Sequence, residues 1–394
     1  LLFLCATALF AEGPAFRVEN LRCEGVADPL GIETPLPFLT WNLIADARGA
    51  RQTAFQVLVA SRPELLNENA ADLWNSGRVS STAQRVSYAG KPLRAAGRAF
   101  WTARIWNEQD SASEWSAPSN WTMGLPAPAD WEAKWIAGPE TPAPLPIFRK
   151  EFDAARPIAR AVAFVCGLGH FDLFLNGAKV GDHFCDPGWT DYKDSCLYVT
   201  FDVTGQLREG RNALGVMLGN GMYNVTGGRY TKFTGSFGEP KLILQLHIDY
   251  EDGTTERVVS DASWRTDHGP ITFSCVYGGE DYDARLEQPG WERPGFDDTN
   301  WKTAREVEGP GGVLRASEAP PLTVAETLKP VQFKSDTPGE WRIDMGLNLS
   351  ARPVVKLRGP AGSSVTVRVG ELANAPWEGH SYTYTLRGEG DEWL

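Results

Sequence analysis

Alternating apolar and polar residues in the middle of the chain predict a sheet there. Residues 171–175 (FDLFL) alternate as a half-buried strand does, and Asn176 and Gly177 then supply the positive φ angles of a tight type I′ turn. Two further apolar runs follow this predicted hairpin, at 197–203 and 213–218. The loops between such strands are where binding residues are expected to collect.

Strand-like stretches also occur on both sides of this region. Residues 53–60 and 98–106 alternate in the same way, and the runs 241–250 and 254–260 are joined across Asp252-Gly253, a second hairpin signal. Turn residues separate the predicted strands, and no helical crossover is evident between them. The pattern therefore predicts an all-β chain whose sheets are antiparallel.

Three β-sandwich units and a leader account for the 394 residues. Residues 12–127 are typical of an immunoglobulin or fibronectin III sandwich. A short Pro-containing linker, 125–129, leads into residues 128–318, which we interpret as a jelly roll. Residues 319–394 contain only the opening strands of a third sandwich, so we expect this domain, and the gene product, to be truncated.

Composition and charge support this interpretation and exclude several functions. The 15 Trp, 10 Tyr and 18 Phe, with 40 Gly and 27 Pro, favour short strands joined by turns. A net charge of −12 argues against nucleic acid or an anionic membrane as a partner, and neutral sugars remain compatible. The Gly-rich segments lack the Lys-Ser/Thr of a phosphate loop, and no Gly-x-Ser-x-Gly elbow of a serine hydrolase is present.

The first eleven residues, LLFLCATALFA, resemble the apolar part of a secretory signal peptide. We therefore expect an exported protein, periplasmic or extracellular, and no other segment approaches the ~20 apolar residues of a membrane span. Of the six cysteines, Cys5 lies in this leader, which leaves an odd number, five, at irregular spacing. Buried free thiols are the favoured state, and a Cys185–Cys196 disulfide is the alternative.

Several motifs recur in one order and carry a family resemblance. The segments DPGWTDY (186–192), LYVTFDVT (197–204) and LREGRNALGVMLGNGMYN (207–224) closely resemble the N-terminal β-sandwich of bacterial α-L-rhamnosidases of glycoside hydrolase family 78. The resemblance extends in both directions over nearly the whole chain. It implies tandem non-catalytic sandwiches, of which the first is a spacer or docking element.

The resemblance also implies what the parent protein does. The family hydrolyses terminal α-L-rhamnosyl residues of glycosides or polysaccharides by inversion, with two acidic residues and no organic cofactor. That acidic pair lies in an (α/α)₆ barrel downstream of the sandwiches, and no segment of this chain is typical of six helical hairpins. We therefore expect no catalytic residue in this chain, and a fragment that is inactive alone.

Sugar contact is the candidate chemistry of the two loops that contain DPGWTDY and GNGMYN. Aromatic rings stack on the apolar face of a pyranose, and amides and carboxylates bind its hydroxyls. The candidate substrate-binding residues are Trp189, Asp191, Tyr192, Asn220, Tyr223 and Asn224. The favoured structural alternative is that Trp189 belongs to the core and that residues 219–221 form only a tight turn.

Acidic residues at two places are weak candidates for a Ca²⁺ site, because Ca²⁺ prefers several oxygen ligands. These candidates are Asp186 in the first loop, and Glu280, Asp281 and Asp283 farther along the chain. The favoured alternative for the last three is that they cap turns and pair with Arg285. The resemblance adds that some family members hold rhamnose through calcium in this second domain.

Two rival functions remain from the sequence. The first is a stand-alone carbohydrate-binding or surface-attachment protein that never had a catalytic domain. The second is a different glycosidase built on similar sandwiches, since a fold does not determine the substrate. The specificity of the DPGWTDY and GNGMYN motifs favours the rhamnosidase over this last alternative.

Overall fold

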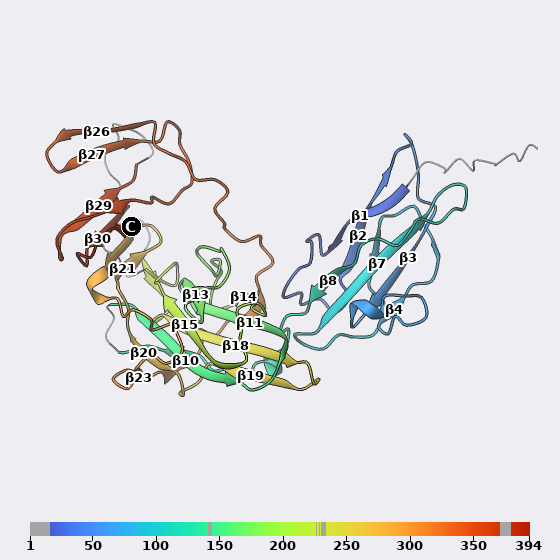
Figure 1. Ribbon diagram of the computed structural model, residues 1–394, viewed down its shortest axis with the longest axis horizontal. Coiled ribbons are helices and arrows are strands. Elements are labelled where there is room, and N and C mark those ends of the chain that lie inside the picture. Colours follow the sequence, from blue (N-terminus) through green and yellow to red (C-terminus); the bar gives the residue numbers. More distant parts are fainter. Residues whose placement is uncertain (1–15, 141–143, 226, 228, 230–233, 371–379) are drawn as a thin grey trace, which may run out of the picture. The chain divides into compact units, whose positions relative to one another are not determined.

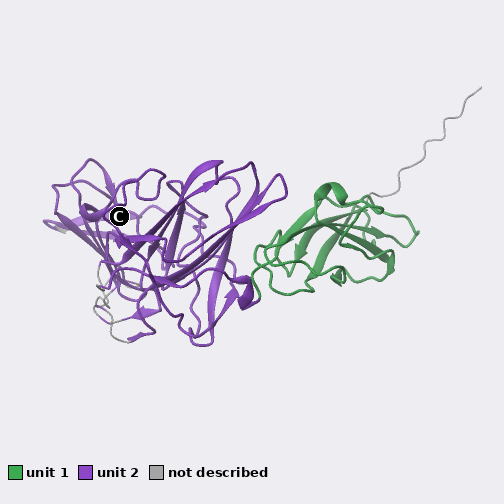
Figure 2. Ribbon diagram, turned by 90° about the horizontal axis from the view of Figure 1, so that it is seen from below, with its two compact units in different colours: residues 1–126 green, residues 127–394 purple. Residues whose placement is uncertain are grey.

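The computed structural model describes residues 16–140, 144–225, 227, 229, 234–370 and 380–394. Within these ranges the elements are β-strands and short 3₁₀ turns, so the all-β prediction is confirmed (Figure 1). The chain separates into two compact units, residues 1–126 and 127–394 (Figure 2). The predicted signal segment 1–11 lies outside the described residues.

Unit 1 is a sandwich of two antiparallel sheets. One sheet has the order β1 (Phe16–Cys23), β2 (Phe38–Ala45) and β6 (Arg85–Ser87). The other has the order β4 (Trp74–Asn75), β3 (Ala54–Ala60), β7 (Arg98–Trp106) and β8 (Ser119–Thr122), with β5 (Val79–Ser80) also on β3. Trp41, Trp101 and Trp121 are buried between the sheets, so these large rings fill the core.

Two larger sheets form the jelly roll of unit 2. The six-stranded sheet has the order β13 (Ala178–Lys179), β12 (Phe171–Leu175), β15 (Gly210–Leu218), β10 (Pro146–Ala154), β20 (Arg265–His268) and β23 (Lys302–Thr303). The seven-stranded sheet has the order β24 (Arg305–Glu306), β9 (Ile136–Ala137), β18 (Lys241–Tyr250), β11 (Ile158–Leu168), β14 (Ser195–Asp202) and β25 (Val313–Ala316), with β19 (Thr255–Val259) on β18. Their facing apolar residues form one core.

Both predicted hairpins are present. Asn176 and Gly177 join β12 to β13 with φ values of 54° and 89°, the left-handed region that a type I′ turn requires. The β18–β19 pair turns across Asp252-Gly253. The antiparallel expectation fails at β25, which pairs in parallel with β14. A long connection brings β25 to this sheet edge, and such a connection permits either direction.

A smaller sheet joins strands from distant parts of unit 2. Its order is β21 (Ile271–Cys275), β22 (Gly279–Asp283), β30 (Ser381–Thr385) and β29 (Ser364–Arg368), and β22 pairs in parallel with β30. Strands from both sides of the predicted 318/319 boundary therefore share one sheet. Three two-stranded sheets also occur among the described residues of this unit: β16 (Asn224–Val225) with β17 (Gly235–Ser236), β26 (Gln332–Thr337) with β27 (Glu340–Asp344), and β28 (Lys356–Leu357) with β31 (Glu392–Trp393).

Gly279 makes the β22–β30 pairing possible. It has a φ of +89°, and a Cβ placed on it would lie 1.8 Å from the Ser381 carbonyl oxygen. Gly279→Ala should therefore destabilise this sheet by about 3 kcal/mol, because the new methyl group meets rigid backbone. Urea unfolding of the whole chain measures this loss.

Gly253→Ala is the matched control. Gly253 has a similar φ of +82°, but a Cβ there meets nothing within 4 Å. Only the backbone strain of about 1 kcal/mol is then expected. If both variants lost the same free energy of unfolding, the close approach of Gly279 to Ser381 would not be the cause of the loss in Gly279→Ala.

Candidate functional site

The two predicted sugar-binding loops meet through buried tyrosines. The Tyr192 and Tyr223 rings pack edge to face with centroids 5.1 Å apart, and both also contact Phe237. Tyr192 and Tyr223 are only 1% and 0% exposed, and burial raises the pKa of both hydroxyl groups. The Tyr223 hydroxyl donates to the Phe237 carbonyl at 3.1 Å. The contact between these two tyrosines therefore joins the two loops in the protein interior.

Trp189 and Asp191 lie on the outer side of the same loop. Trp189 is 61% exposed, so its interpretation as a core residue is wrong: it lies on the segment between β13 and β14. Asp191 is exposed and accepts a hydrogen bond from the Lys193 amide at 3.1 Å. The loop thus carries an exposed aromatic ring and, two residues later, an exposed carboxylate, and both kinds of group suit contact with a pyranose.

Asn220 and Asn224 hold the second loop in place. The Asn220 side-chain amide donates to the Ser274 carbonyl at 2.9 Å, and the Asn224 amide donates to Asn220 Oδ1 at 3.0 Å. The Asn220 carbonyl accepts from the Tyr223 and Asn224 amides, which closes a turn. The turn therefore spans residues 220–224 and not 219–221, and both side chains tie this turn together and to β21.

The acidic residues of β22 have different environments. Asp283 accepts from the Arg285 guanidinium at 2.7 and 2.9 Å and from its backbone amide, and this pairing lowers the pKa of Asp283. The predicted pairing with Arg285 is thereby confirmed for Asp283. Asp281 lies 3.1 Å from Arg229.

No calcium ligand set is evident among the acidic candidates. Asp186 binds His183 Nδ1 at 2.9 Å. In the described part of the chain, no group of three or more His, Cys, Asp and Glu residues is arranged to hold a metal ion. Calcium binding therefore stays a prediction without a defined site.

Glu280 is the acidic residue whose environment is most unusual, and sequence reasoning missed its neighbours. Burial, and then the negative charge of Asp172, raise its pKa to about 7, while Arg352 acts in the opposite direction. Asp172 itself pairs with Lys179 at 2.6 Å, and the Arg352 guanidinium lies over the Phe184 ring at 4.0 Å. A carboxyl group of this kind both donates and accepts hydrogen bonds near neutral pH.

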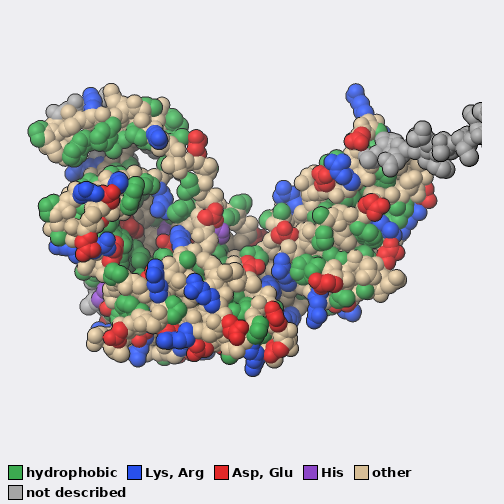
Figure 3. Space-filling model, in the orientation of Figure 1, with side chains coloured by type: hydrophobic (Ala, Val, Ile, Leu, Met, Phe, Trp, Pro, Cys, Tyr) green, Lys and Arg blue, Asp and Glu red, His purple; other side chains and the backbone are tan. Residues whose placement is uncertain are grey.

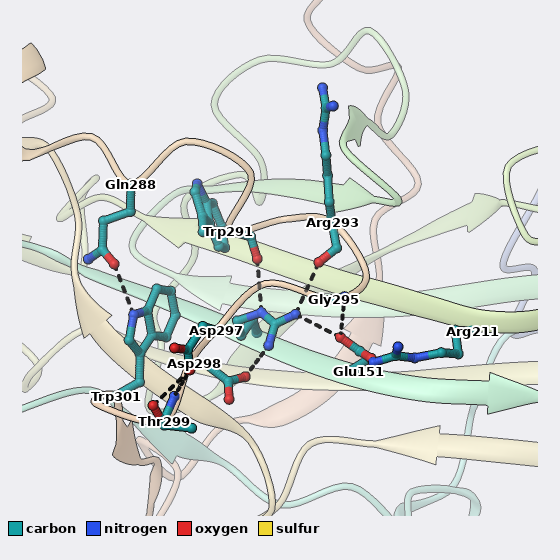
Figure 4. A network of polar contacts seen from close by, with 11 residues as sticks. Glu151, Arg211, Gln288, Trp291, Arg293, Gly295, Asp297, Asp298, Thr299 and Trp301 are labelled. Carbon is teal, nitrogen blue, oxygen red and sulfur yellow. Dashed lines mark hydrogen bonds and ion pairs between the residues drawn. The ribbon is translucent and has the colours of Figure 1, made fainter.

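Arg149 is the most deeply buried charged residue among those described in unit 2, and its role is structural. Arg149, which is 1% exposed, donates to the carbonyls of Trp291 at 2.9 Å and Arg293 at 3.1 Å, and it pairs with Glu151 and Asp298 (Figure 4). These bonds fasten the segment 288–301 over the outer face of the six-stranded sheet. Arg149 thus contacts four protein groups, which suits a structural role.

The cysteines among the described residues are free thiols. Cys166 and Cys196 are buried, as are Cys23 and Cys275, whereas Cys185 is exposed. The free-thiol prediction is confirmed, but burial was wrong for Cys185, which lies on a loop. The alternative Cys185–Cys196 bridge does not form.

Among the described residues, no helix has the length and apolar character needed to cross a membrane.

Two family models match successive parts of the chain. Residues 18–127 match the Rha78A-like N-terminal immunoglobulin domain, and residues 156–326 match the α-L-rhamnosidase N-terminal domain. The chain belongs to the N-terminal region of the α-L-rhamnosidase family. The resemblance seen in the sequence motifs is thereby confirmed.

Relatives of this family are longer than the chain. An α-L-rhamnosidase of Formosa agariphila is 34% identical over 353 residues, which are 82% of this chain and 37% of the relative. The solved α-L-rhamnosidase of Dictyoglumus thermophilum matches 96% of this chain and 45% of its own, at 37% identity and a TM-score of 0.87. The Streptomyces avermitilis enzyme, solved in complex with L-rhamnose, matches 96% of this chain and 54% of its own, at 26% identity and a TM-score of 0.88. The chain thus spans about two fifths to a half of these proteins.

Proposed function

We propose that this chain is the N-terminal, non-catalytic part of an α-L-rhamnosidase that hydrolyses terminal α-L-rhamnosyl residues from glycosides or polysaccharides. The main support is the shared architecture, since 96% of the chain matches the Dictyoglumus thermophilum enzyme at a TM-score of 0.87. The order of the two family domains supports the same proposal.

In this proposal a further domain, an (α/α)₆ barrel, supplies the catalysis. Inverting hydrolysis needs one carboxylic acid and one carboxylate about 6.5–9.5 Å apart, with room for a water molecule. Asp283 and Asp281 are paired with arginines, which suits structural roles better than acid or base catalysis. The sandwiches would pack against the barrel and shape the rim of its cleft. No organic cofactor is required.

The substrate proposal is a glycan or glycoside that contains L-rhamnose. The exposed Trp189 ring and the exposed Asp191 carboxylate, two residues apart in one loop, are the features of the jelly roll that best suit contact with such a sugar. The apolar leader supports an exported protein, periplasmic or extracellular.

Activity measurements test this function. Residues 1–394 are expected to release no detectable 4-nitrophenol from 4-nitrophenyl α-L-rhamnopyranoside. The product of the reading frame continued beyond codon 394 is expected to hydrolyse it with inversion, which NMR of the first-formed sugar measures. A frame that continues without helical repeats and clustered acids would contradict the proposal, as would hydrolysis by the chain alone.

The rival is a stand-alone carbohydrate-binding or surface-attachment protein. A stop codon after residue 394, with stable soluble protein, would favour it. Calorimetric titration of the chain with L-rhamnose, with and without Ca²⁺, then decides whether the jelly roll binds the sugar. Absence of binding in both titrations would leave only a structural role.

A further inference from the structure

Two loops of unit 1, residues 46–53 between β2 and β3 and residues 107–118 between β7 and β8, are fastened to each other. The Thr53 hydroxyl donates to the Asn107 carbonyl at 2.8 Å. The Asn107 side-chain oxygen accepts from the Gln109 amide at 3.0 Å, which orders the second loop. A site between such loops is formed in advance, so it loses little conformational entropy when a ligand binds.

A cavity of about 190 Å³ opens between these two loops. It is smaller than the roughly 300–1,000 Å³ pockets of drug-sized ligands, and a single sugar ring suits it better than a longer chain. Lys and Arg side chains, drawn in blue, are visible on the surface of this end of unit 1 (Figure 3). The lining residues that matter for recognition are Phe16, Leu43, Arg48, Arg51, Glu108 and Gln109.

Arg48 and Arg51 are the cations of this cavity, and both are exposed. Among the described residues, neither guanidinium lies within ion-pair distance of a carboxylate. Arg78 of the same unit, by contrast, pairs with Asp110. A guanidinium presents its donors in a planar fork that matches a carboxylate. Two unpaired guanidinium groups at one cavity therefore suit an anionic group of a ligand.

The other lining residues narrow the class of ligand. Glu108 opposes the two arginines, so the cavity carries a net charge of +1, which one negative charge of a ligand balances. Phe16 and Leu43 offer apolar surface of the kind that the apolar face of a pyranose contacts. A carboxylate is also more compact than a sulfate ester, which favours it in a cavity of this size.

We propose that this end of unit 1 binds a uronate residue of an acidic glycan. The uronate carboxylate lies against Arg48 and Arg51, and its ring lies against Phe16 and Leu43. The site would hold the chain on an acidic polysaccharide without taking part in hydrolysis. The inference goes beyond the proposed function and does not depend on it, because every residue of the site belongs to unit 1.

A matched pair of sugars tests this site. Residues 1–394 are titrated with methyl β-D-glucuronide and with methyl β-D-glucoside, which differ only in the carboxylate, and saturation-transfer NMR gives both dissociation constants. The glucuronide is expected to bind at least about 10-fold more tightly, because charge-assisted hydrogen bonds to the guanidinium groups form only with it. Equal affinities would overturn the proposal. Tighter binding of methyl β-D-glucoside 6-sulfate would identify a sulfated sugar as the ligand and overturn the assignment to a uronate.

Substitutions in unit 1 give the control. The double variant Arg48→Gln and Arg51→Gln should remove the preference for the glucuronide, and because both side chains are exposed the protein should stay folded, which circular dichroism checks. Arg78→Gln removes an arginine that pairs with Asp110 outside the cavity, so the preference should remain. Glu108→Gln should tighten glucuronide binding about threefold, since a repelling charge is lost. A preference that survives the double variant, or that Arg78→Gln reduces equally, would overturn the proposal.

Discussion

Arg149→Met is expected to destabilise the jelly roll by about 3–5 kcal/mol, because it removes one partner from a buried network of charges. Arg149 is 1% exposed, and its guanidinium also lies over the Phe296 ring at 5.4 Å. Without it, Asp298 loses its cation, and the carbonyls of Trp291 and Arg293 lose their donor. Native-state hydrogen exchange of the β10 and β15 amides measures the lost free energy of unfolding.

Arg211→Met is the matched control for this prediction. Arg211 pairs with the same Glu151, but its side chain is 65% exposed. Its removal is expected to cost less than about 1 kcal/mol, since water replaces an exposed partner at little cost. If the β10 and β15 amides exchanged equally fast in both variants, the burial of Arg149 would not explain its contribution to the free energy of unfolding.

Local signals explain why parts of the jelly roll were predictable from the sequence. Asn176 and Gly177 determine their own turn, and the strands on each side of Asp252-Gly253 pair with their nearest neighbours. The Arg149 network has no such signal. Asp298 is 149 residues away in the chain, so nothing in the segment around Arg149 marks it as the anchor of a distant loop.

Within the candidate loops, the sequence likewise does not indicate which side chains are buried. Trp189 and Tyr192 lie three positions apart in one segment, yet Trp189 is 61% exposed and Tyr192 is 1% exposed. A loop has no fixed alternation, and the ring of Tyr192 is buried by Tyr223 and Phe237, which arrive from other segments. Residue type therefore singled out the aromatic residues of the candidate loop but not which of them faces solvent.

Pairing between strands that are far apart in the sequence was not predictable either. β22 and β30 pair in parallel although Gly279 and Ser381 are about 100 positions apart, and periodicity alone does not select partners at such distances. This pairing brings Glu280 into a sheet with strands predicted to belong to another domain. The raised pKa of Glu280 follows from its burial and from the charge of Asp172 on β12, which belongs to another sheet.

Glu280→Gln is expected to stabilise the chain at pH 8 by up to about 3 kcal/mol and to change little at pH 4. Burial and Asp172 raise the pKa of Glu280 from its ordinary 4.5 to about 7, with Asp281 adding to the rise and Arg352 opposing it. Burial and then the Glu280 charge raise the pKa of Tyr382 on β30. Burial and Glu287 raise the pKa of Tyr282 on β22, and the Glu280 charge adds to that rise.

The sign follows from proton binding in the two states. Between pH 4.5 and about 7 the folded protein holds the Glu280 proton more tightly than the unfolded chain does. Stability is therefore lost as the pH rises through this window and stays lower above it. Glutamine does not ionise, so the variant escapes this loss. Urea unfolding at pH 4, 6 and 8 measures the difference in the free energy of unfolding.

Asp283→Asn supplies a control of opposite sign on the same strand. Arg285 lowers the pKa of Asp283, so its contribution is present at neutral pH and is lost as the pH falls. The asparagine variant is expected to lose less than about 1 kcal/mol at pH 8, because Arg285 is exposed, and nothing at low pH. The outcome that contradicts this prediction is a gain in the free energy of unfolding from Glu280→Gln that is no larger at pH 8 than at pH 4. Burial and Asp172 would then not raise the pKa of Glu280.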